Sequence, residues 1–120
     1  MEKTIRIDGK DYKMKSSAYT QFAYKNETGR GLLSDIMDLQ KLNLDNINEN
    51  VDIIDKLNAT VLQMAYCMIK EADKSQVGNF EEFLRGIENL YDNTEWITET
   101  IEVATSPLSR GLLKESKTNE

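Results

Sequence analysis

Paired carboxylates are the residues of this sequence whose spacing could support acid–base catalysis or metal binding. They are Asp35 with Asp38, Asp52 with Asp55, and Glu95 with Glu99 and Glu102. In a helix, residues three or four positions apart share a face, so each set could flank an ion or a scissile bond. Acidic residues opposite an apolar stripe are also ordinary on a soluble helix, and no His or Cys joins them. We therefore predict no catalytic residue, no metal site and no cofactor.

Other motifs that carry chemistry are missing or incomplete. The chain has no histidine, which removes Ser–His and Cys–His nucleophile pairs and histidine metal sites. The single cysteine, Cys67, lies within an apolar stripe, which favours a buried structural thiol. Residues 45–50 do not match a calcium-binding loop, because Ile47 replaces a ligand and Asn50 replaces the required glycine. The segment 29–31 lacks the Lys-Ser/Thr of a phosphate loop, and we interpret it as a break between helices.

Length and charge indicate one compact, acidic domain. The chain has 120 residues and a net charge of −6, which disfavours a protein built to bind nucleic acid. Residues 1–30 carry seven basic and four acidic residues, whereas residues 31–108 carry five basic and fifteen acidic residues. Such asymmetry is compatible with ordinary solvated faces, which we favour, and with self-association or an oppositely charged partner. A homo-oligomer is therefore left open.

The hydropathy of the sequence indicates where in the cell the protein is expected. The first residues lack the apolar stretch of a secretory signal. The longest apolar run, 61–69, is interrupted by Gln63 and is far shorter than the ~20 residues that a membrane helix needs. We expect a soluble, cytoplasmic protein without membrane contact.

Period-two alternation predicts a β-hairpin over residues 4–15. Asp8-Gly9 supplies its turn, because Gly accepts a positive φ without penalty. The residues expected on its inner face are Ile5, Ile7, Tyr12 and Met14. Its basic residues are Arg6, Lys10, Lys13 and Lys15. They could contact nucleic acid, but cations on a hairpin also block edge-to-edge pairing, and we favour this second role.

Five helices are expected after the hairpin, at about 18–28, 32–42, 51–73, 80–90 and between a cap at 92–95 and Pro107. Tyr19, Phe22 and Ala23 mark the apolar stripe of the first helix. The third carries the strongest stripe and is the expected central element. The predicted fold class is thus α+β and mainly α, an N-terminal β-hairpin followed by about five helices around a long central helix. Residues 1–108 would form a single domain, with the hairpin at 4–15, a helical body at 17–106, a loop at 43–50 and a flexible tail at 109–120.

The opening of the chain carries a family resemblance. A short hairpin with Asp8-Gly9-Lys10 precedes a helix with Phe22, a break at Thr28-Gly29 and a leucine-rich second helix. This order resembles the tail assembly chaperones of long-tailed bacteriophages and prophages of Gram-positive bacteria. The resemblance covers about the first third of the chain, and the rest is similar in helical pattern, size, acidity and polar C-terminal tail.

The resemblance implies a non-enzymatic role in the cytoplasm of a bacterial host. Such chaperones bind the helix-rich tape measure protein, help bring tail tube subunits to it, and are absent from the mature virion. The family often makes a second, longer product by ribosomal frameshifting near the end of the short reading frame. An apolar groove between helices with acidic edges would suit a helical client. Candidate partner-binding residues are Phe80, Phe83, Trp96 and Ile97.

Two alternative functions belong to other classes of protein. A small acidic regulator of a phage or mobile element could mimic DNA charge, which requires one continuous surface of carboxylates over 31–108. The apolar stripes and the interspersed basic residues of that region weigh against it. A small enzyme that uses carboxylates alone would need a deep pocket with two convergent carboxylates.

Overall fold

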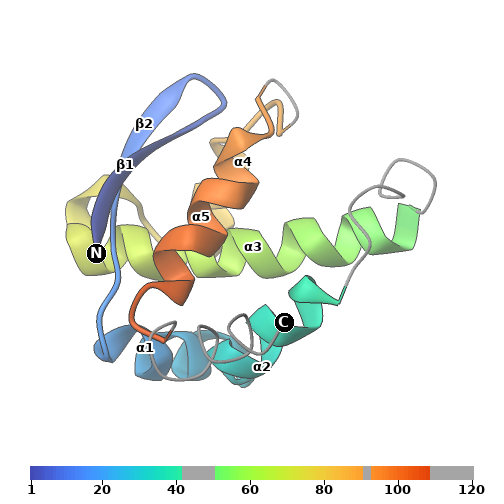
Figure 1. Cartoon of the computed structure of the whole chain (residues 1–120). Helices are drawn as coiled ribbons and strands as arrows, with labels where there is room; N and C mark the ends of the chain where they lie inside the picture. The colour runs from blue at the N-terminus through green and yellow to red at the C-terminus, as the bar shows by residue number, and fades with distance from the viewer. Residues whose placement is uncertain (42–50, 91–92, 109–120) are drawn as a thin grey trace.

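The computed structural model describes residues 1–41, 51–90 and 93–108, with the backbone alone at 51–54. The elements, in chain order, are β1 (Glu2–Ile7), β2 (Lys10–Lys15), α1 (Tyr19–Thr28), α2 (Leu32–Gln40), α3 (Val51–Ala72), the three-residue 3-10 helix η2 (Lys74–Gln76), α4 (Phe80–Arg85) and α5 (Glu95–Thr105) (Figure 1). A two-stranded antiparallel hairpin thus precedes a mainly helical body, and the predicted fold class is confirmed. The predicted loop at 43–50 and tail at 109–120 lie outside the described residues.

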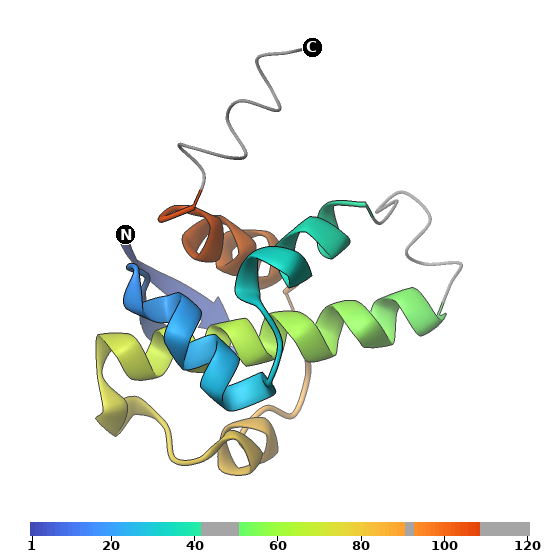
Figure 2. The same ribbon diagram turned by 90° about the horizontal axis from the view of Figure 1, so that it is seen from below.

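Helix α3 is the element against which the others pack. It contacts β2, α1, α2, α4 and α5. The hairpin lies on one side of α3 and the pair α1 and α2 on the other, while α5 crosses α3 and covers β1 (Figures 1 and 2). One hydrophobic cluster joins side chains of the hairpin to those of all five α-helices. In the described ranges, no helix has the length and apolar character needed to cross a membrane.

The hairpin forms as the alternation predicts. Its register runs from Glu2 opposite Lys15 to Ile7 opposite Lys10, and Asp8 and Gly9 both adopt positive φ, of 52° and 73°. This is the geometry of the two-residue turn that matches the strand twist. The four residues expected on the inner face are all buried: Ile5, Ile7, Tyr12 and Met14.

The free edge of β2 is closed by a side chain. The Gln76 amide donates to the Lys13 carbonyl at 3.0 Å and accepts from the Lys13 N–H at 2.8 Å. These two bonds occupy the backbone N–H and carbonyl of Lys13, which a neighbouring strand would otherwise use. Together with the exposed lysines of β2, they protect this edge from pairing with another chain.

The predicted stripe of α1 is wrong in part. Thr20 and Tyr24 are the buried residues, whereas the Tyr19 and Phe22 side chains are 61% and 69% exposed. The hydroxyl groups of Thr20 and Tyr24 find carboxylate partners on α3 and α2, so their burial leaves no polar group unpaired. This orientation turns Tyr19 and Phe22 toward solvent.

Helix α4 is shorter than predicted. It begins at a capping box, in which Asn79 and Glu82 each accept the other's backbone N–H, but it ends at Arg85 rather than near Leu90. Gly86 follows, a residue of low helix propensity. Beyond it the backbone bonds elsewhere, because the Glu88 N–H donates to the Asp8 carboxylate at 2.8 Å and the Leu90 carbonyl accepts from Trp96 at 3.0 Å.

Substitution of Gly9 tests whether its positive φ makes glycine necessary in the hairpin turn. A Cβ added at Gly9 would meet no atom within 4 Å. The cost in stability of an alanine there is therefore the backbone penalty of a φ of +73°. We expect Gly9→Ala to lower the free energy of unfolding by about 1–2 kcal/mol. Gly86→Ala is the control, because Gly86 has φ −79° and an added Cβ would make only ordinary contacts. Urea denaturation should place Gly86→Ala at or slightly above the wild type, and equal losses for both variants would contradict the explanation.

Candidate partner-binding surface

The four predicted partner-binding residues separate into two buried and two partly exposed side chains. Phe83 is 3% exposed and Trp96 is fully buried. Phe83 stacks edge-on against Tyr12 with ring centroids 5.7 Å apart. The Trp96 indole N–H is satisfied by a backbone carbonyl. In this fold neither side chain is available to a partner, because the core under the hairpin and α5 requires large apolar residues at both positions.

Phe80 and Ile97 are only partly buried, and the structure does not bring them together. Phe80 lies on α4 against Tyr66, with ring centroids 5.3 Å apart. Ile97 lies on α5 and lines a small apolar pocket of about 180 Å³ with Leu39, Leu57 and Ile101. Their role in partner binding stays a prediction.

The most exposed aromatic side chains of the described residues lie instead on α1. Tyr19 and Phe22 are one turn apart, and each lines a groove beside the helix. The groove between α1 and α2 has about 420 Å³ and contains Phe22 and Leu33. The groove between α1 and the C-terminal half of α3 has about 500 Å³ and contains Tyr19 and Cys67. We call Tyr19, Phe22 and these two grooves the α1 ridge.

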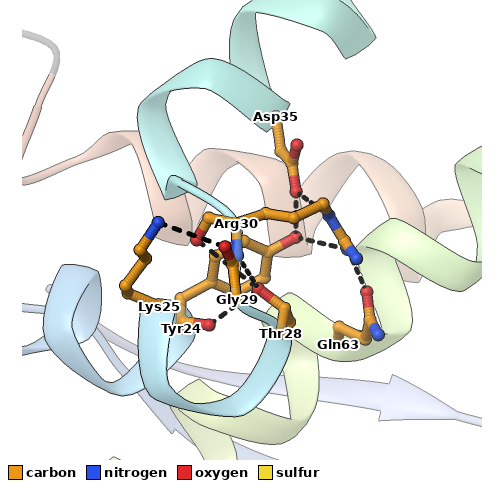
Figure 3. A network of polar contacts seen from close by, with 7 residues as sticks. All are labelled: Tyr24, Lys25, Thr28, Gly29, Arg30, Asp35 and Gln63. Atoms are coloured by element: carbon orange, nitrogen blue, oxygen red, sulfur yellow. Dashed lines mark hydrogen bonds and ion pairs between the residues drawn. The ribbon is translucent and has the colours of Figure 1, made fainter.

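Behind the ridge, a polar network fixes the turn between α1 and α2 (Figure 3). The buried Tyr24 hydroxyl donates to the Asp35 carboxylate at 2.6 Å, and the Arg30 Nε donates to the same oxygen at 2.9 Å. Arg30 also reaches Gln63 on α3. Burial, reinforced by Asp35, raises the pKa of Tyr24, and the hydrogen bond to Asp35 raises the pKa of Arg30. Both groups therefore keep their protons, and α2 stays tied to α1 and α3.

A second set of hydrogen bonds holds the start of α1 on the end of α3. The Ser17 and Thr20 hydroxyls each donate to a different oxygen of the Glu71 carboxylate, both at 2.6 Å. Hydrogen bonds to an ionised acceptor are stronger than those between neutral groups. Glu71 thus fastens α1 in the orientation that exposes Tyr19 and Phe22.

Among the side chains that the structure describes, which do not include Asp52, the predicted carboxylate pairs do not converge on a common site. Asp35 is occupied by Tyr24 and Arg30, and Glu99 and Glu102 face Lys3 at 3.2 Å and 3.8 Å. Within the parts of the chain that are described, no group of three or more His, Cys, Asp or Glu side chains could hold a metal ion. The absence of catalysis stays a prediction. What the geometry offers is the α1 ridge, with two exposed aromatic side chains beside two grooves.

Comparison with known protein families, curated proteins and solved structures yields no match to this chain.

The polar network predicts a difference between two neighbouring carboxylates. Asp35→Ala would leave the buried Tyr24 hydroxyl without its acceptor, and we expect a loss of about 1–3 kcal/mol in unfolding free energy. Asp38→Ala on the same helix is the control, because Asp38 is exposed, and its effect should stay within about 0.5 kcal/mol. Thermal denaturation of the two variants measures this difference. Equal melting temperatures would show that the network does not stabilise the fold.

The buried thiol is predicted to be unreactive in the folded protein. Cys67 is buried as the sequence suggested, and burial, with a contribution from Glu27, raises its pKa to about 12. At pH 8 the thiolate fraction should be roughly a thousandfold below that of an exposed cysteine. A thiol reagent should label the native protein slowly and the urea-unfolded protein at once. Equally fast labelling of both states would contradict the burial of this thiol.

Proposed function

We propose that this protein is a non-enzymatic tail assembly chaperone that binds the tape measure protein of a long-tailed phage or prophage and helps bring tail tube subunits to it. It would act in the cytoplasm of the bacterial host and be absent from the mature virion. The observation that carries the proposal is the α1 ridge, where two aromatic side chains are exposed although the domain already has a closed core. The resemblance of the opening segment supplies the class of client.

The exposed ridge supports a binding role on physical grounds. Large apolar side chains grouped beside grooves are a feature of surfaces that bind another protein. Amphipathic helices bind such grooves through apolar residues spaced by three and four positions. A tape measure protein is rich in helices of this kind, and the net charge of −6 would help to keep a complex with it in solution.

The distribution of charges weighs against the DNA-mimic alternative. Cations stand among the carboxylates of the described surface, because Lys3 pairs with Glu99, Arg30 with Asp35, and Arg85 with Glu81. A mimic of the DNA backbone needs an uninterrupted row of negative charge. The pairs interrupt that row on α2, α4 and α5.

Co-expression tests the proposed function. The protein would be produced together with the tape measure protein that this proposal expects to be encoded near it, a very long and helix-rich protein, with an affinity tag on one of the two. We expect the long protein to move from the pellet to the soluble fraction and to co-purify, because its apolar stretches would be covered. An unrelated acidic protein of similar size is the control. If the long protein stays in the pellet and does not co-purify, the chaperone function is wrong.

A further inference from the structure

We infer that this protein self-associates through the open edge of β1. Strand β1 would pair antiparallel with β1 of a second copy and join the two two-stranded hairpins into one continuous sheet. The pairing centres on Thr4, so that Glu2 of each copy lies opposite Arg6 of the other. It does not depend on the protein being a chaperone. Figure 1 shows the hairpin at the periphery of the molecule.

Every second residue of β1 has unpaired backbone groups. In an antiparallel pair, alternate residues bond to the facing strand, and the residues between them point their N–H and carbonyl groups away from it. Met1 and Ser16 form one bonded pair, through contacts of 2.9 and 2.8 Å. Counted from there along the register, the residues of β1 with outward groups are Glu2, Thr4 and Arg6. Among the described residues, no hydrogen bond is made by the main-chain groups of these three.

The other edge of the hairpin is already closed. On β2, Gln76 occupies the outward N–H and carbonyl of Lys13, and Lys13 faces Thr4 in the register. No described side chain does the same for β1, although its three outward residues are exposed. A row of open N–H and carbonyl groups is a template for a further strand. Only an extended strand can satisfy all of them together, which identifies the kind of occupant.

A second copy fits this edge because the pairing is symmetric about Thr4. A two-fold axis through the centre of the new strand pair places Thr4 opposite its own equivalent. Residues at equal distances on either side then face each other, so Glu2 meets Arg6 at both ends. Each facing pair can exchange two backbone hydrogen bonds. The outward groups of all three residues of β1 would thus be paired.

The charges on the exposed face of the hairpin complement one another in this arrangement. Within one hairpin, Glu2 faces Lys15 and Arg6 faces Asp11. Self-pairing extends both contacts into rows that cross the whole sheet and alternate in sign: Lys15 and Glu2 of one copy, then Arg6 and Asp11 of the other. Opposite charges on facing strands stabilise a sheet, and like charges destabilise it. A shift of the second copy along the strand would place Thr4 opposite Glu2 or Arg6 and lose these rows.

The present contacts of these side chains leave room for the new pairs. The Arg6 Nε lies 3.9 Å from the Asp11 carboxylate, and the two side chains are 65% and 66% exposed, so this ion pair is weak. Arg6 also donates to the Gly9 carbonyl at 3.3 Å. A guanidinium has five N–H donors, so Arg6 can keep Asp11 and still bind Glu2 of the second copy. Among the ion pairs of the described residues, none involves Glu2.

Carboxylates of α5 oppose the association. Glu99 and Glu102 lie 3.2 and 3.8 Å from Lys3, so one lysine of β1 meets two glutamates. The two-fold axis is perpendicular to the sheet, and the α5 helices that pack on β1 would therefore approach each other on the same face. Their surplus of negative charge is repulsive. We expect a weak dimer that forms reversibly, and its affinity should rise when Glu102→Gln removes part of this charge.

Sedimentation velocity over a series of protein concentrations measures the association. We expect the wild type to shift from monomer to dimer as its concentration rises. Thr4→Pro removes the N–H at the centre of the pairing and should abolish the dimer, while the monomer keeps its fold because an edge strand tolerates proline. Thr4→Val is the matched control, since it keeps the N–H and a β-branched side chain, and it should dimerise like the wild type. Circular dichroism verifies that each variant is folded.

Charge variants test the facing pairs and leave the backbone groups in place. Glu2→Arg and Arg6→Glu each put like charges opposite one another at both ends, and each should weaken dimerisation at least about tenfold. An equimolar mixture of the two variants restores opposite charges at both ends of a mixed dimer. We expect this mixture to associate more strongly than either variant alone. Amide hydrogen exchange locates the contact, because exchange at Thr4 should be slower in concentrated than in dilute wild-type protein.

Several outcomes would overturn the inference. One is a wild type that stays monomeric at every concentration. Another is a dimer that Thr4→Pro and the two charge variants leave intact, because the contact would then lie elsewhere. Loss of the dimer in Tyr19→Ser/Phe22→Ser but not in Thr4→Pro would assign self-association to the α1 ridge. A mixture of the charge variants that associates no better than its components would contradict the pairing of Glu2 with Arg6.

Discussion

The burial of residues 64–69 of α3 on every side is the constraint on which the rest of the structure depends. Six consecutive residues of this helix, from Met64 to Ile69, are all buried. Six residues cover more than a full turn of a helix, so no face of this segment is left to water. A helix enclosed in this way needs covering elements in several directions. The hairpin, α1, α4 and α5 supply them, and a chain of 120 residues can afford only short elements for the purpose.

The sequence predicts the elements whose own residues determine their geometry. Asp8-Gly9 forces the hairpin turn, and strict alternation then decides which face of the hairpin is apolar. The stripe of α3 is long enough that no other period fits it. Gly29 ends α1 in the left-handed conformation, and the Asn79 capping box begins α4. Each of these features depends on contacts within a few residues, which is why the sequence alone is sufficient.

The sequence predicts less well which face of a short helix is buried and where that helix ends. On α1, the pair Thr20 and Tyr24 competes with the pair Tyr19 and Phe22, and hydrophobicity favours the second pair. Partners remote in sequence decide otherwise, since Glu71 accepts from Thr20 and Asp35 accepts from Tyr24. The end of α4 depends similarly on Asp8, which lies eighty positions from the Glu88 N–H that it binds. Such contacts leave no local signal, and the sequence likewise does not decide whether Phe83 and Trp96 face a partner or the core, where the structure buries both.

Attachment of α1 through hydrogen bonds separates the task of holding the helix from the task of presenting its aromatic residues. If Tyr19 and Phe22 packed on α3, α1 would be held by the hydrophobic effect and would offer only polar groups to solvent. Because the Glu71 and Asp35 carboxylates hold it together with the buried Tyr24 ring, the helix is fixed on one side while Tyr19 and Phe22 stay exposed on the other. The backbone of a ridge held in this way is already positioned before a partner arrives, which reduces the entropy lost on binding. The polar network behind α1 is therefore as much a part of the candidate binding surface as the aromatic rings in front of it.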